Sequence, residues 1–127
     1  MGMKLDHTDR LMANSDSWLH NAETAEVSEN SRVSFAFVAG YNALQSVQPL
    51  YKGPLEDHPL PVIVEKGAEL IALSEADRNL GLRLQEWEYT RYFLEPKPVT
   101  VDEAIAWAKT VREAALKFLA SAPPAPP

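Results

Sequence analysis

The chain has 127 residues, 46% of them hydrophobic, a net charge of -6 and no cysteine. This length suits one domain with its own core, and the lack of cysteine excludes disulfides, thiolate metal sites and a cysteine nucleophile. The negative charge gives the protein as a whole no attraction for nucleic acid, although it leaves room for a local basic patch. The longest apolar run, residues 35–41, is far shorter than the roughly 20 residues of a membrane span, so we expect no membrane insertion and a cytoplasmic location.

The first two predicted helices precede a proline-rich loop. Apolar residues at three- and four-residue spacings from Thr8 to Ala25 predict the first helix. Residues 28–47 are the most apolar stretch, with small residues threaded among large ones, and an element that is apolar on nearly all sides is normally buried on most of them. We therefore expect this stretch to be the central helix of a bundle, with Ser28 as its cap.

Prolines and capping residues mark the later connections. Residues 49–61 contain four prolines and one glycine, which indicates a loop. Beyond it, one apolar stripe ends near Ile71 and another starts after Ser74, which predicts either one helix kinked near Ser74 or two helices in series. The sequence from Ser74 to Asp77 resembles a capping box, and residues 100–103 form a complete one at the start of the last helix.

These elements together predict an all-α fold, an up-and-down bundle of four or five helices that forms one domain over residues 1–122. Four of the five residues in 123–127 are proline, so we expect a disordered tail there. On the last helix, Trp107 and Phe118 belong to a second apolar stripe. This stripe either is buried between several helices or faces a second copy of the chain in a homodimer.

No complete catalytic or metal-binding motif is present. A di-iron bundle needs Glu-x-x-His on two helices, and none of the three histidines follows a glutamate at that spacing. A nucleophile elbow and a glycine-rich phosphate loop are also missing. The scattered helical glycines Gly67 and Gly81 suit close packing better than ligand binding. We therefore assign no catalytic residue, no metal ligand and no cofactor from the sequence.

The densest functional-looking cluster spans residues 78–92. Arginines and aromatic residues are interleaved along it, a pattern that can bind a nucleotide or single-stranded nucleic acid through charge and base stacking. The plainer interpretation is an amphipathic helix whose arginines pair with the many nearby glutamates. The candidate nucleotide or nucleic-acid-binding residues are Arg78, Asn79, Arg83 and Tyr89.

The overall layout resembles the HEPN superfamily of helical domains. Residues 32–47 are similar to the family's second helix, and residues 80–93, followed by a turn and a last helix, resemble its later half. His58 resembles a histidine that members often carry before the third helix. The resemblance implies a homodimer and a partner of the nucleotidyltransferase or toxin–antitoxin type.

The arginine–histidine pair of the family's ribonucleases is missing. The histidine usually follows the arginine after four to six residues, and after Arg78 those positions hold Arg83, Leu84 and Gln85. RNA cleavage by this pair needs an imidazole to move protons near neutral pH, and the chain has no histidine at the required positions. We therefore expect a non-catalytic HEPN-like interaction module. The alternatives are a divergent ribonuclease or nucleotide-binding enzyme that uses the face of residues 78–92, and a purely structural accessory protein.

Overall fold

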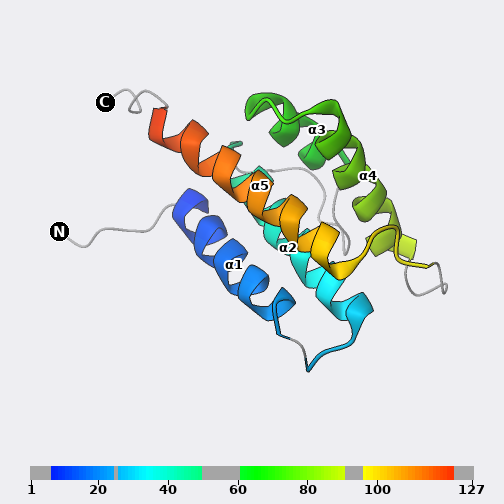
Figure 1. The fold of residues 1–127 in the computed structure, drawn as a ribbon. Helices are drawn as coiled ribbons and strands as arrows, with labels where there is room; N and C mark the ends of the chain where they lie inside the picture. Colours follow the sequence, from blue (N-terminus) through cyan, green and yellow to red (C-terminus); the bar gives the residue numbers. More distant parts are fainter. Residues whose placement is uncertain (1–6, 25, 50–60, 91–95, 122–127) are drawn as a thin grey trace.

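The computed structural model describes residues 7–24, 26–49, 61–90 and 96–121, and within these ranges it contains five helices and no strand. The predicted all-α bundle is therefore confirmed (Figure 1). Its elements are α1 (His7–Ala22), α2 (Glu29–Ser46), α3 (Pro61–Leu70), α4 (Glu75–Thr90) and α5 (Val101–Ser121). Most of the predicted proline-rich loop, with His58, lies outside the described residues, as do the predicted tail at 123–127 and residues 91–95 of the arginine-rich cluster.

α2 is the central helix, as its composition predicts. α1 and α5 pack closely along it, and α3 and α4 contact it more loosely (Figure 1). Its side chains Phe37 and Leu44 are fully buried, and burial of each contributes about 1.5–3 kcal/mol. In the described part of the chain, no helix has the length and apolar character needed to cross a bilayer.

Glycines allow the helices around α2 to approach one another. A Cβ atom at Gly40 would overlap the ring of Trp107 from α5, and one at Gly67 of α3 would lie 2.8 Å from the Leu44 Cβ atom. A Cβ atom at Gly81 of α4 would lie 3.0 Å from Trp107 Cζ2. Gly67 and Gly81 thus stand at close helix contacts, in agreement with the packing role expected for them.

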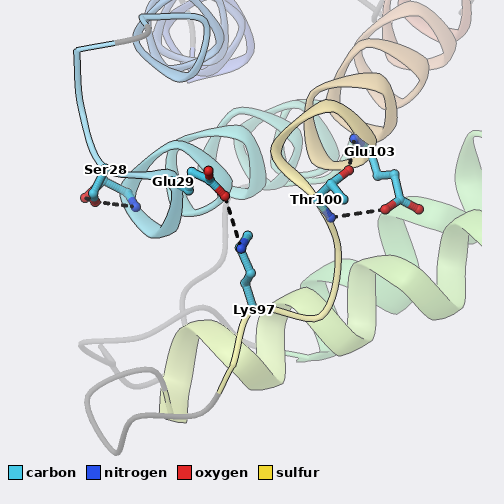
Figure 2. Close-up of polar contacts among 6 residues, drawn as sticks. Ser28, Glu29, Lys97, Thr100 and Glu103 are labelled. Atoms are coloured by element: carbon cyan, nitrogen blue, oxygen red, sulfur yellow. Dashed lines mark hydrogen bonds and ion pairs between the residues drawn. The ribbon is translucent and has the colours of Figure 1, made fainter.

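The caps predicted for α2 and α5 are both formed (Figure 2). The Ser28 hydroxyl accepts a hydrogen bond from the Ser31 backbone N–H at 3.2 Å. At the start of α5, Thr100 Oγ1 accepts from the Glu103 N–H and Glu103 Oε1 accepts from the Thr100 N–H, both at 3.1 Å. The two exchanged bonds satisfy backbone donors that have no partner inside the helix.

Of the two alternatives near Ser74, the structure has two helices in series. α3 ends at Leu70 in two backbone hydrogen bonds of the Schellman type, and Ala72 has a left-handed φ of 53°. The Ser74 hydroxyl then accepts from the Asp77 N–H at 3.1 Å, which caps α4. We refer to α3 and α4 with this turn, residues 61–90, as the α3–α4 pair.

A buried polar contact ties α1 to both α2 and α5. The Ser15 hydroxyl is fully buried and donates to the Ala39 carbonyl of α2 at 2.6 Å. It accepts in turn from Arg112 Nε of α5 at 3.3 Å, and the Arg112 guanidinium also lies 3.5 Å from the Asp16 carboxylate. Because the buried hydroxyl has both a donor and an acceptor as partners, it fixes the relative position of the three helices. We refer to α1, α2 and α5 as the three-helix body.

Candidate functional site

All four predicted binding residues are exposed on α4. At 100° per residue, Arg78 and Tyr89 lie almost in line along the helix, and Asn79 and Arg83 lie on the neighbouring row. Eleven residues of helix span about 16 Å, so Arg78 and Tyr89 stand too far apart for one small ligand. We call this surface the α4 face; its exposed polar and aromatic residues are Glu75, Arg78, Asn79, Arg83, Glu86 and Tyr89.

The α4 face points toward solvent because the apolar stripe on the opposite side of α4 is buried. Leu84 and Trp87 are buried there, and Gly81 lies against the Trp107 ring. Leu80 is partly buried on the same side. Because these residues recur at three- and four-residue spacings, burying them turns the arginines toward solvent.

The charges of the α4 face are mixed. Neither the Arg78 nor the Arg83 guanidinium forms an ion pair with any residue in the described ranges. Arg91 and Glu95, which the interpretation of paired arginines and glutamates also included, lie outside these ranges, so that interpretation stays a prediction. Arg83 does act electrostatically on Glu103 at the start of α5. Hydrogen bonds to Thr100 lower the pKa of the Glu103 carboxyl, the backbone bond most and the side-chain bond next, and the charge of Arg83 adds to this effect.

A hollow of about 290 Å³ adjoins the α4 face at its C-terminal end. Its lining residues are Arg83, Glu86, Trp87, Thr90 and Pro98. Trp87 is only 4% exposed, and the Thr90 hydroxyl donates within its own helix to the Glu86 carbonyl at 3.0 Å. The hollow therefore offers a guanidinium and a carboxylate beside apolar surface. Of the four predicted residues, only Arg83 lines it; Arg78, Asn79 and Tyr89 do not converge there.

A second hollow, of about 270 Å³, lies where the N-terminal ends of α2 and α5 approach each other, and sequence reasoning did not select it. Arg32 lines it, but Arg32 Nε donates to the Ala22 carbonyl at 2.8 Å. Beside it, Lys97 pairs with Glu29 at 3.2 Å (Figure 2). The cations at this hollow thus serve structural contacts. This hollow forms where the starts of α2 and α5, which are far apart in the chain, lie close together. The sequence does not reveal that proximity.

The predicted interface residue Trp107 is buried inside the monomer. It is 2% exposed, its ring stacks on Phe37 with centroids 6.0 Å apart, and its indole N–H donates to the Asp77 carbonyl at 2.9 Å. Burial between several helices was one of the two alternatives for this stripe, and it holds for Trp107. The predicted contact of Trp107 with a second copy is therefore wrong. Phe118 is half-buried against the same core, and its part in a dimer stays a prediction.

Comparisons with protein-family models, with curated proteins and with solved structures find no match for this chain. Across residues 7–24, 26–49, 61–90 and 96–121, no group of three or more histidine, aspartate or glutamate side chains is arranged to hold a metal ion. The HEPN resemblance thus stays a hypothesis that rests on the sequence, and the functional argument depends on the α4 face.

Proposed function

We propose that this protein is a non-catalytic, HEPN-like interaction module of the cytoplasm that binds another protein through the α4 face and the hollow beside Arg83. The observation that carries the proposal is the exposure of two arginines, an asparagine and a tyrosine on one side of a single helix. Tyr89 is 53% exposed, although it is a large aromatic side chain. Tyrosine and arginine are enriched in protein–protein interfaces and among the residues that carry most of the binding energy.

The charges favour a protein over a nucleic acid as the partner. The two arginines of the α4 face are accompanied by Glu75 and Glu86, so the described residues of this face have no net positive charge. The whole chain carries -6. A phosphate backbone binds mainly by replacing counterions with positive side chains, and this surface offers no surplus of them. A protein surface of mixed charge can instead match arginines and glutamates one by one.

The residues that occupy the three possible histidine positions after Arg78 support a non-catalytic role. Of the three positions at which the family's histidine would follow Arg78, Leu84 and Gln85 are buried, and only Arg83 points outward. Arginine stays protonated near neutral pH, so it cannot replace an imidazole as a proton carrier. The resemblance implies a nucleotidyltransferase or a toxin–antitoxin-type protein as the partner.

The alternative, a divergent ribonuclease or nucleotide-binding enzyme, is supported by the two arginine guanidinium groups that form no ion pair with the described residues. The separation of about 16 Å between Arg78 and Tyr89 favours an extended strand over a mononucleotide as its ligand. Labelled single-stranded RNA distinguishes the two functions. Cleavage by the pure protein that disappears in Arg78→Ala would establish the alternative and overturn the non-catalytic proposal.

The direct test is capture from the organism's own lysate with the wild-type chain and three variants as bait. We expect a partner that wild type retains and that Arg83→Glu and Tyr89→Ala lose. Lys66→Glu is the matched control, because Lys66 is exposed on α3 and the charge reversal is the same. With the identified partner purified, each α4-face variant should weaken binding at least tenfold and the control less than twofold. Equal binding by all four proteins would refute the assignment of the α4 face.

A further inference from the structure

The helices divide into two groups that are packed to different degrees. α1 and α5 lie along α2 over most of their lengths, whereas α3 and α4 contact α2 more sparsely (Figure 1). The described parts of α3 and α4 have few contacts with α5. Because the free energy of opening a segment follows the contacts that are broken, the α3–α4 pair and the three-helix body are expected to differ in local stability.

One side chain spans the space between α5 and α4. The indole of Trp107 leaves α5 and lies against Gly40 of α2 and Gly81 of α4. Its N–H donates to the Asp77 carbonyl in the first turn of α4. This buried ring and its hydrogen bond therefore help to hold α4 against α5.

The α3–α4 pair also shares the hydrophobic core with the body through Val64, Ile71, Leu84 and Trp87. Two polar contacts add to this packing. Gln48 Nε2 donates to the Ile63 carbonyl of α3 at 2.8 Å. The Ser34 hydroxyl of α2 donates to Glu88 Oε1 of α4 at 2.9 Å. The body by contrast is joined internally by the buried Ser15 hydroxyl, with partners on both α2 and α5.

We propose that the α3–α4 pair opens from the three-helix body as one unit while the body stays folded, and that the hydrogen bond from the Trp107 indole to Asp77 is broken in this opening. The turn at 71–74, with its own backbone hydrogen bonds, stays inside the moving unit. The opening also changes the hollow beside Arg83, because Arg83 and Thr90 belong to α4 and Pro98 to the segment that leads into α5. The candidate binding site therefore lies across the boundary between the two parts. This inference concerns motion and does not depend on the identity of any partner.

Native-state hydrogen exchange of the full chain at low denaturant tests the inference. Amides of α3 and α4 are expected to share one opening free energy, lower than that of the central amides of α2 and α5, with a smaller denaturant dependence. A single free energy and a single denaturant dependence for all five helices would overturn the proposal, and the wild-type protein alone suffices for this outcome.

Two single-residue variants test the opening further: Ser15→Ala separates it from global unfolding, and Trp107→Phe tests whether it breaks the indole contact. Ser15→Ala removes a contact that the open form keeps, so it should lower protection in the centre of α2 roughly 2- to 12-fold and leave α3 and α4 unchanged. Trp107→Phe removes the donor of the hydrogen bond to Asp77, which is broken both in opening and in global unfolding, so it should lower protection in the α3–α4 pair as well as in α2. Because the ring also packs on Gly40 inside the body, the factor in α2 should be at least as large as that in the pair. If Ser15→Ala lowers protection of the pair as much as that of α2, the bundle unfolds as one unit and the proposal fails.

Discussion

Gly40→Ala is expected to destabilise the protein, because Gly40 of α2 lies directly against the Trp107 ring of α5. The new Cβ atom would overlap Trp107 Cζ3 and lie 2.6 Å from Cη2 and 3.1 Å from Cε3. All three are ring atoms, and the ring is 2% exposed and anchored by its hydrogen bond to Asp77. The clash therefore cannot be relieved by rotating a flexible side-chain end; α2 or α5, or the ring together with α4, has to shift.

The magnitude follows from two opposing effects. Alanine is favoured over glycine in a helix interior by about 1 kcal/mol, whereas overpacking of a core costs about 1–3 kcal/mol. At Gly40 three ring atoms are too close, so the upper part of that range applies and the net loss is about 1–2 kcal/mol. Gly81→Ala is the matched control. Its Cβ atom would lie 3.0 Å from Trp107 Cζ2 and 3.2 Å from Val64 Cγ1, so a small shift suffices and the change should stay within about 0.5 kcal/mol.

Urea unfolding followed by circular dichroism measures both variants, and a double-mutant cycle assigns the cause. Trp107→Phe removes the larger ring, so Gly40→Ala should cost less in that background than in the wild type, with a coupling of about 1 kcal/mol. Wild-type stability in Gly40→Ala, or the same loss in both backgrounds, would refute the argument that the Trp107 ring makes glycine necessary at this position.

Three further predictions concern the turn, the polar contacts and the cap. Ala72→Gly is expected to stabilise the protein by about 0.5–1 kcal/mol in urea unfolding, because glycine adopts the φ of 53° without the strain that alanine bears; a loss of stability would contradict this. Gln48→Ala should lower the unfolding free energy by about 1–2 kcal/mol, since the buried amide donates to the Leu44 and Ile63 carbonyls, whereas Asn79→Ala on the exposed side of α4 should change little. The lowered pKa of Glu103 means that its stabilising effect is present above its ordinary pKa of 4.5 and is lost as the pH falls through the folded-state value. Glu103→Gln should therefore show a flatter decline of stability in acid, and identical pH profiles for the two proteins would exclude this role.

The sequence alone determined the local elements of this protein. Hydrogen bonds between residues three apart, such as those of Ser28 with Ser31 and Thr100 with Glu103, depend only on the neighbouring residues, and both caps form as expected. The burial of α2 also followed from its composition, because a helix that is apolar on nearly all sides has no stable place at a surface. At Ser74 the periodicity detected the break in the pattern but could not distinguish a kink from two helices.

Only the tertiary structure decided which side chains meet. Ser15 and Arg112 are 97 positions apart, and nothing in their local sequence pairs them. Trp107 lay on a stripe that also suited a dimer interface, and its burial depends on Gly40 and Gly81 of two other helices. The same holds for Arg83, which lines a hollow together with Pro98 from the segment that leads into α5. Helical periodicity specifies the direction in which a side chain leaves its own helix, but the neighbour that it reaches is set by how all five helices pack together.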